Sequence, residues 1–157
     1  MQVAIIFGSE SDKDVMQGAA NCLKHFDISF KAYVLSAHRV PELLTETLLQ
    51  LEQDGVEVII AGAGLAAHLP GVIASKTILP VIGVPIKAAL GGLDALFSIV
   101  QMPKSIPVAT VGINNSFNAA LLAVQILSLA DKNLQQKLRI YRQEMQAKCS
   151  TKITIDL

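Results

Sequence analysis

The sequence predicts an α/β domain of the doubly wound, three-layer α/β/α type, with five parallel strands and an extra C-terminal helix. Short, continuously apolar runs alternate with windows in which apolar residues recur at helical spacing. The runs lack the polar alternation of strands that face water on one side, so we expect a parallel sheet covered on both faces by helices. A length of 157 residues suits one such domain, and a hydrophobic fraction of 52% supplies its core.

The strands of this sheet are expected in the apolar runs Val3–Phe7, Phe30–Leu35, Val56–Ala61, Val81–Val84 and Val108–Val111. Helices are expected in the windows that follow them, near Val15–Leu23, from Pro41 to Leu51, over Leu93–Val100 and over Asn118–Leu129. Pro41 suits a first helical position because its missing N–H has no helical partner there. This alternation is typical of flavodoxin-like or Rossmann-like domains, and we expect the strand order 2-1-3-4-5.

The C-terminal part of the chain is predicted to form an additional helix over residues 131–148. Its polar majority leaves one apolar stripe, made of Leu134, Leu138, Tyr141 and Met145. Two interpretations stay open: the helix packs on a neighbouring subunit, or it folds back on its own domain. We assign residues 1–148 to a single domain and residues 149–157 to a loose tail.

Composition and charge exclude several classes of function. With 13 Lys and Arg against 13 Asp and Glu, and no Trp, the chain lacks the basic field and aromatic platforms of a nucleic-acid-binding protein. Ala119–Ala130, the most lipid-like stretch, is too short to span a bilayer. Cys22 and Cys149 form no disulfide framework, and free thiols fit a reducing cytoplasm. A mean hydropathy of +0.48 exceeds the needs of a small monomer, so we expect a homo-oligomer.

Ligands bind open parallel sheets outside the carboxyl ends of the strands, near the point where the strand order reverses. Polar and glycine residues cluster in three loops at that edge, 8–12, 36–39 and 62–71. In the first loop, Ser9 and Ser11 can hold a phosphate at a helix start, and Asp12 can accept hydrogen bonds from sugar hydroxyls. The alternative is that Ser11 is only a helix N-cap, with Asp14 in an imperfect capping box.

The other two loops add groups for proton transfer and anion binding. His38 carries a ring that can exchange a proton near neutral pH, and Arg39 can bind a phosphate through two parallel hydrogen bonds. The alternatives are that His38 merely ends a strand and that Arg39 is a solvated surface charge. His68 either faces the ligand or caps the following helix, whereas His25 is interpreted as a surface histidine near a helix end.

Other chemistries lack their sequence patterns. No His-x-x-x-His pair or Cys/His cluster predicts a metal site, no Gly-x-Ser-x-Gly elbow predicts a serine hydrolase, and no Gly-x-Gly-x-x-Gly fingerprint predicts a dinucleotide. The residues by themselves therefore indicate a small phosphorylated, sugar-containing ligand and one histidine acid/base, with no metal and no cofactor.

Several segments between about residue 3 and about residue 145 also form a joint pattern. They read GSESD at 8–12, SAHR at 36–39, IAGAG at 60–64, AAHLPG at 66–71, SIVQMP at 98–103 and NAALLA at 118–123. In these segments the chain resembles the N5-carboxyaminoimidazole ribonucleotide mutases, the class I catalytic subunits of phosphoribosylaminoimidazole carboxylase. The resemblance implies a flavodoxin-like subunit of a homo-octamer in de novo purine biosynthesis, functionally coupled to an ATP-dependent synthetase.

The resemblance also implies a reaction and roles for the site residues. A carboxylate moves from the exocyclic nitrogen of the substrate to ring carbon 4, without metal, ATP or biotin. By position, Ser9 and Arg39 would bind the phosphate, with Ser11 nearby, and Asp12 would bind the ribose. Ser36 and Ala37 would line the pocket and His38 would transfer the proton. The loop from Gly64 to His68, which includes Ala67, would enclose the carboxylate.

The chain departs from the family pattern at three places. Leu65 stands where the family usually has Gly, and the segments 87–92 and 111–118 are shorter than usual. We expect these departures to change the contacts of the later loops. Three further functions stay open. They are direct carboxylation of aminoimidazole ribonucleotide with CO2, as class II members perform it, nucleotide binding without catalysis, and a component of an assembly whose main role is contact with other subunits.

Overall fold

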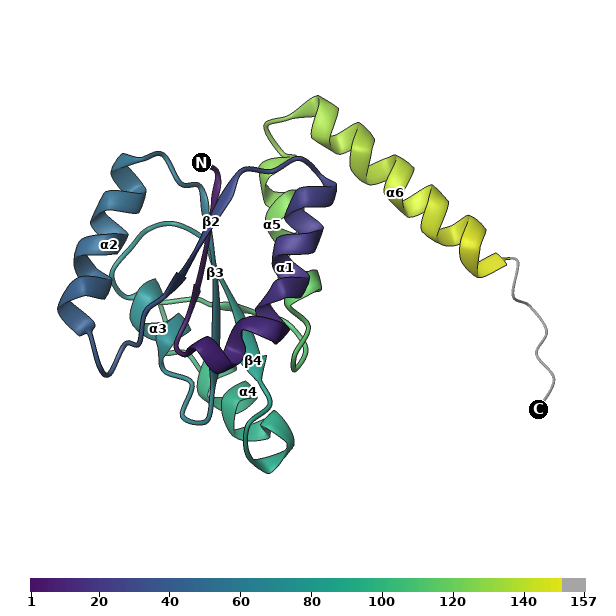
Figure 1. Ribbon diagram of the computed structural model, residues 1–157. Coiled ribbons are helices and arrows are strands. Elements are labelled where there is room, and N and C mark those ends of the chain that lie inside the picture. The colour runs from purple at the N-terminus through teal and green to yellow at the C-terminus, as the bar shows by residue number, and fades with distance from the viewer. Residues whose placement is uncertain (151–157) are drawn as a thin grey trace, which may run out of the picture.

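A computed structural model of the chain describes residues 1–150. Its sheet has five strands, all parallel, in the order β2-β1-β3-β4-β5, as predicted (Figure 1). The strands are β1 (Val3–Phe7), β2 (Phe30–Val34), β3 (Val58–Gly64), β4 (Val81–Ile86) and β5 (Ala109–Thr110). Strands β1 and β4 are buried along their whole length because helices cover both faces of the sheet.

Helices form the two outer layers (Figure 1). The α-helices are α1 (Lys13–His25), α2 (Pro41–Gln53), α3 (Leu69–Ala74), α4 (Leu93–Val100), α5 (Ser116–Leu127) and α6 (Lys132–Ser150), with 3-10 turns at η1 (Glu10–Asp12) and η2 (Leu90–Gly92). One core cluster joins α1 and α5 to the sheet, and a second joins α2, α3 and α4 to its other face. The three-layer arrangement is therefore confirmed.

Four of the five strands have boundaries that differ from the predicted ones; β2 ends one residue early, at Val34, and β3 begins two residues late, at Val58. β3 continues past Ala61 to Gly64, so the glycines expected in a loop belong to the strand. β4 continues through Pro85 because β5 pairs only with Ile82 and Gly83, which leaves the proline without a ladder partner on that side. β5 itself has two residues instead of the four expected.

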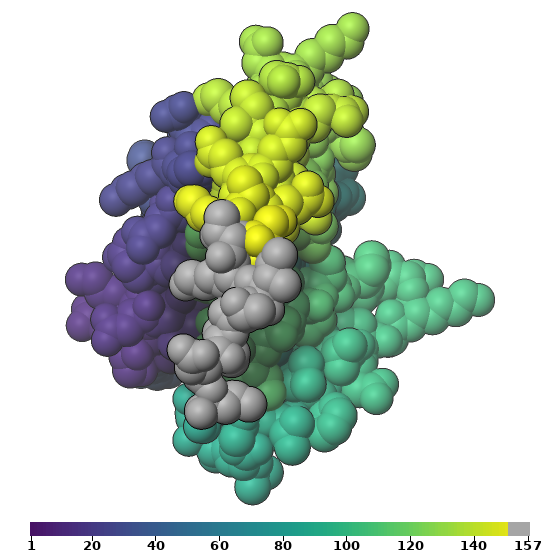
Figure 2. All heavy atoms as spheres, turned by 90° about the vertical axis from the view of Figure 1, so that its right-hand side faces the viewer, coloured from purple at the N-terminus to yellow at the C-terminus, as the bar shows by residue number. Residues whose placement is uncertain are grey.

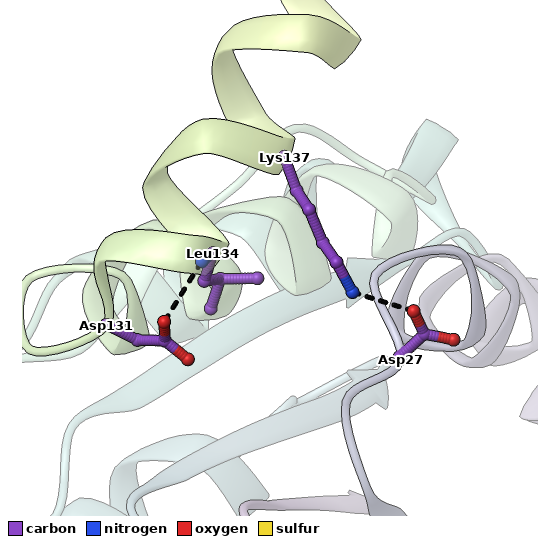
Figure 3. Close-up of polar contacts among 4 residues, drawn as sticks. All are labelled: Asp27, Asp131, Leu134 and Lys137. Atoms are coloured by element: carbon purple, nitrogen blue, oxygen red, sulfur yellow. Dashed lines mark hydrogen bonds and ion pairs between the residues drawn. The ribbon is translucent and has the colours of Figure 1, made fainter.

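The first half of α6 folds back on its own domain. The Asp131 carboxylate caps the helix by accepting from the backbone N–H groups of Asn133 and Leu134, at 2.8 and 3.1 Å. Leu134 is buried, and Lys137 forms an ion pair with Asp27 at 2.7 Å (Figure 3). The hydrogen bond and positive charge of Lys137 lower the pKa of Asp27. One of the two open interpretations of this helix is thus correct for its first half.

The second half of α6 extends away from the domain (Figure 1). Every residue from Arg142 to Ser150 is exposed. Figure 2 looks directly onto α6, which stands as a ridge on this side of the molecule. The expected tail is helical at Cys149 and Ser150, because α6 runs two residues further than predicted, and residues 151–157 lie outside the described part. None of the helices within residues 1–150 is long and apolar enough to cross a membrane.

Candidate active site

A cavity of about 580 Å³ lies at the carboxyl ends of β1, β2 and β3. This is the edge where the chain leaves β1 for one side of the sheet and β3 for the other, the place at which doubly wound sheets bind ligands. The predicted site residues that line it are Ser9, Ser11, Asp12, Ser36, Ala37, His38, Arg39, Gly64 and His68. Three loops that are distant in sequence thus contribute to one cavity.

The first loop is organised by two serine hydroxyls. The Ser9 hydroxyl oxygen accepts from the backbone N–H of Ser11 at 3.4 Å and from the Ser11 hydroxyl at 2.9 Å. Ser9 is therefore the N-cap, and it caps the short turn η1. The alternative that Ser11 caps the following helix is wrong, because Ser11 lies within η1 and Asp12 occupies the N-cap position of α1, which begins at Lys13.

Asp12 occupies the N-cap position of α1 without capping it. Its carboxylate makes no hydrogen bond to the helix N–H groups and lies 3.5 Å from the Ser11 hydroxyl. Burial raises the pKa of this carboxyl, while the hydrogen bonds from Ser11 and Ser9 oppose that shift. Asp12 thus presents acceptor oxygens to the cavity in a partly desolvated place, where hydroxyl groups of a ligand would be strong partners.

The second loop is tied to the first through Arg39. Its guanidinium donates from Nη2 to the Gly8 carbonyl at 2.7 Å. This bond holds the Arg39 side chain across the start of the first loop, beside Ser9 on the cavity wall. Arg39 is therefore more than a solvated surface charge. A guanidinium fixed in this way keeps further N–H donors for an anionic ligand.

Two histidines meet inside the cavity. His38 Nε2 lies 2.8 Å from His68 Nδ1, and the two rings are nearly perpendicular at 85°. His68 stands at the N-cap position of α3 but makes no capping bond, so the capping alternative is wrong. A bond between two imidazoles needs an N–H on one ring and a lone pair on the other. It leaves Nδ1 of His38 as the nitrogen that can exchange a proton with a ligand.

In the third loop, the backbone at Gly64 lies close to β4, and Leu65 has an unusual backbone conformation. A Cβ at Gly64 would lie 3.1 Å from the Ile86 carbonyl oxygen, so a side chain there would crowd β4. Leu65 follows with a φ of +57°, a backbone region that disfavours side chains, and is 55% exposed at the cavity rim. Ala67, which we expected at the substrate, is 1% exposed and belongs to the core cluster that joins α2, α3 and α4 to the sheet.

The cavity is also lined by Ala63, Ala66 and Leu69, which belong to the predicted loop 62–71 but had no predicted role of their own. Ala88 lies outside the three predicted loops. Ala88 comes from the loop after β4 and reaches the cavity because that strand continues to Ile86. An isolated alanine carries no signal of function in a sequence. His25, in contrast, lies at the exposed end of α1 against Phe26 and Tyr141, as a surface histidine should.

Comparison with known proteins finds relatives over nearly the whole chain. The AIR carboxylase family matches residues 2–148 of the chain. A Pyrococcus abyssi protein named N5-carboxyaminoimidazole ribonucleotide mutase is 57% identical over 145 residues, which cover 92% of this chain and 83% of that protein. A Methanocaldococcus jannaschii protein of the same name is 55% identical over 146 residues, covering 93% and 91%.

The fold has a solved counterpart as well. The crystal structure of Treponema denticola PurE superposes with a TM-score of 0.88 at 30% sequence identity, covering 96% of this chain and 94% of that one. Both the sequence identity and the matching fold extend over nearly the whole chain. The chain belongs to the AIR carboxylase family.

Proposed function

We propose that this chain is an N5-carboxyaminoimidazole ribonucleotide mutase, an isomerase of de novo purine biosynthesis that moves a carboxylate from nitrogen to ring carbon 4. The observation that carries the proposal is the bonded pair of His38 and His68, at 2.8 Å, within a cavity that also holds Ser9, Asp12 and Arg39. Proton-transfer groups and phosphate-binding groups share one enclosure there. The relatives that carry the mutase name are similar over more than nine-tenths of this chain.

The substrate is bound through its phosphate and its ribose. Arg39 and the Ser9 and Ser11 hydroxyls bind the phosphate, which then lies beside the start of η1. Asp12 accepts hydrogen bonds from the ribose hydroxyls. Its negative charge would repel a phosphate, so the two functions divide between neighbouring residues of one loop.

The reaction requires one proton to be given and later recovered. His38 protonates the exocyclic nitrogen, the bond from that nitrogen to the carboxylate carbon breaks, and CO2 is released inside the cavity. Ring carbon 4 then attacks the CO2 carbon and forms a new carbon–carbon bond. His38 removes the proton that carbon 4 still carries, which restores the ring and returns His38 to its starting state. Positioned proton transfer of this kind contributes about 10²–10⁴-fold to a rate.

The remaining residues of the cavity keep the reactants in place. Ser36 and Ala37 line one wall, while the loop from Gly64 to His68 closes the side where the carboxylate moves. Because Gly64 and Ala66 are small, the backbone of this loop can lie against the reacting groups and displace water, which keeps the freed CO2 beside carbon 4. His68 accepts or donates in its bond to His38 and so selects the nitrogen that His38 presents. No cofactor takes part in this sequence of steps.

The protein acts, in this proposal, in the cytoplasm as a homo-octamer, working with the ATP-dependent synthetase that supplies its substrate. Cys22 is buried and Cys149 is exposed, and both carry free thiols, which suits a reducing compartment.

The test follows ring carboxylation by absorbance with two substrates supplied separately. Conversion of N5-carboxyaminoimidazole ribonucleotide to the 4-carboxy product, without added CO2 or bicarbonate, supports the mutase. Conversion only of aminoimidazole ribonucleotide with CO2 would assign direct carboxylation instead. Binding of either nucleotide by calorimetry without any turnover would contradict both reactions and leave a nucleotide-binding protein.

A further inference from the structure

Leu65 adopts a backbone conformation that leucine rarely takes. Its φ of +57° lies in the left-handed region, where a side chain crowds the following carbonyl oxygen. Two short-range backbone bonds fix this turn: the Leu65 carbonyl accepts from the Ala67 N–H at 2.8 Å, and the Ala66 carbonyl accepts from the His68 N–H at 2.7 Å. Backbone strain of this kind persists only where the surrounding structure holds it, and it is concentrated at functional sites.

Packing in the core does not account for the leucine at this position. Its side chain is 55% exposed and belongs to neither of the two core clusters within residues 1–150. Glycine would adopt the same φ without strain, and it would leave no large apolar side chain in contact with water. The backbone and the core therefore give no reason for a leucine here. The remaining surroundings of its side chain are those of the cavity, whose rim it forms.

Leu65 supplies an apolar surface to a cavity whose other exposed side chains are small or polar. Of the lining residues within 1–150, Leu65 and Leu69 carry the large apolar side chains, and Leu69 is only 3% exposed. Leu65 precedes His68 by three residues in the same loop, and His68 is one member of the bonded histidine pair. The groups proposed to bind phosphate and ribose come from the other two loops. The exposed apolar side chain thus shares its loop with a proton-transfer group.

The reaction proposed above requires an apolar cover at this part of the cavity. CO2 carries no net charge, no net dipole and no hydrogen-bond donor, so the charged groups that bind a phosphate would hold it only weakly. Its capture by carbon 4 depends on enclosure of the two reactants together, with water kept out. The flat ring of the nucleotide offers apolar surface, and contact with it would remove the exposed leucine from water at a gain in free energy.

We propose that the Leu65 side chain covers the reacting ring of the bound nucleotide and retains CO2 beside carbon 4. Leu65 then determines whether the carboxylate is transferred or lost. In the loss, the bond from nitrogen to the carboxylate carbon breaks as before and CO2 leaves the cavity. Aminoimidazole ribonucleotide is released with the proton from His38 on its amine, and His38 regains a proton from water. The inference rests on the proposed mutase function and adds the residue that prevents this loss.

The test is a single-turnover reaction of Leu65→Ala with N5-carboxyaminoimidazole ribonucleotide in carbon-13 bicarbonate, with carbonic anhydrase present to supply labelled CO2. Mass spectrometry measures the labelled fraction of the 4-carboxy product, and chromatography measures released aminoimidazole ribonucleotide, both corrected for a protein-free blank. Both quantities should rise roughly tenfold over the unmodified protein, because the shortened side chain loses most of its contact with the ring. Cleavage of the starting nucleotide should keep its rate, since His38 is retained.

Three further variants complete the test. Leu65→Met keeps an apolar side chain of similar volume and should label its product as the unmodified protein does. Leu49→Ala removes a leucine of similar exposure, 54%, from α2 outside the cavity lining, and it should also behave as the unmodified protein. Leu65→Gly suits the φ of this position, so it should fold even if Leu65→Ala does not, and it should repeat the increased labelling. Melting temperatures show which variants are folded.

The outcomes separate this inference from the proposed function. An unchanged labelled fraction in the folded Leu65→Ala or Leu65→Gly variant, while the unmodified protein converts the nucleotide, would contradict the role of Leu65 alone. An equal rise in Leu49→Ala or in Leu65→Met would overturn that role as well. An unmodified protein that leaves the nucleotide unconverted would overturn the proposed function, and this inference with it.

Discussion

The loops at the carboxyl edge of the sheet fall into two groups that do different work. The loops after β1, β2 and β3 supply every charged or hydroxyl side chain of the cavity. The loops after β4 and β5, residues 87–92 and 111–115, supply only Ala88. Both groups leave the same edge of the same sheet, so their position at the carboxyl ends does not explain the difference.

The later loops instead hold each other in place. The Asn114 side chain accepts from the backbone N–H of Lys87 at 2.8 Å, and the Asn114 N–H donates to the Pro85 carbonyl at 2.8 Å. A Cβ on Gly92 would lie 2.7 Å from Ile113. The candidate site residues therefore gather where the strand order reverses, between β1 and β3, while the later loops form a scaffold beside them.

The largest effect is expected at His38, in the first group of loops. His38→Asn should lower turnover by about 10²–10⁴-fold, because the proton carrier is lost while an exposed side chain contributes little to folding. Stopped-flow absorbance of ring carboxylation, together with the melting temperature, checks both parts. His25→Asn is the matched control at an exposed histidine outside the cavity and should turn over normally. Persistent turnover in the His38 variant would contradict the mechanism.

A smaller effect is expected at Arg39. Arg39→Lys keeps the charge but loses the bond to the Gly8 carbonyl and the paired geometry toward phosphate. Charge-assisted hydrogen bonds are worth about 1.5–3 kcal/mol, so KM should rise roughly tenfold to hundredfold. Calorimetry with the nucleotide and with the nucleoside that lacks the phosphate separates the two contributions. Equal weakening for both ligands would show that Arg39 does not contact the phosphate.

At Asp12 we expect binding and stability to change in opposite directions. Because burial raises the pKa of Asp12, the folded state holds this proton more tightly than the unfolded state, and stability is lost as the pH rises above the ordinary value of 3.8. Asp12→Asn removes that loss while weakening ribose binding roughly tenfold. Thermal melts should show the variant slightly more stable than the unmodified protein at pH 7, with the gain vanishing near pH 3. A gain that grows toward low pH would contradict this account.

The smallest effect on activity is expected in the later loops. Asn114→Gly removes the acceptor for the Lys87 N–H while suiting the φ of +58° at this position. Unfolding free energy should fall by about 1 kcal/mol with kcat/KM unchanged, measured by urea denaturation and steady-state kinetics. Asn114→Asp retains an acceptor oxygen and serves as the control. A large loss of kcat in the Asn114→Gly variant would contradict the conclusion that the loops after β4 and β5 do not take part in catalysis.

Much of the fold could be predicted because it follows from local pattern. The apolar runs that contain β1, β3 and β4 are buried on both faces, and Pro41 does begin a helix. The predicted grouping of three loops succeeded for the same reason, since parallel strands bring their carboxyl ends to one edge. The length of β5 and the position of Ala67 could not be predicted, because both depend on how neighbouring segments pack.

The sequence by itself determined the layered α/β architecture, the strand order and the set of polar loops at one edge. Periodicity and the handedness of strand–helix–strand crossovers leave few other arrangements. Only the tertiary structure decided that His38 bonds to His68, that Arg39 reaches Gly8, and that α6 divides into a packed half and an exposed half. Contacts between residues some 30 positions apart depend on the path of each loop, and side-chain type alone does not specify that path.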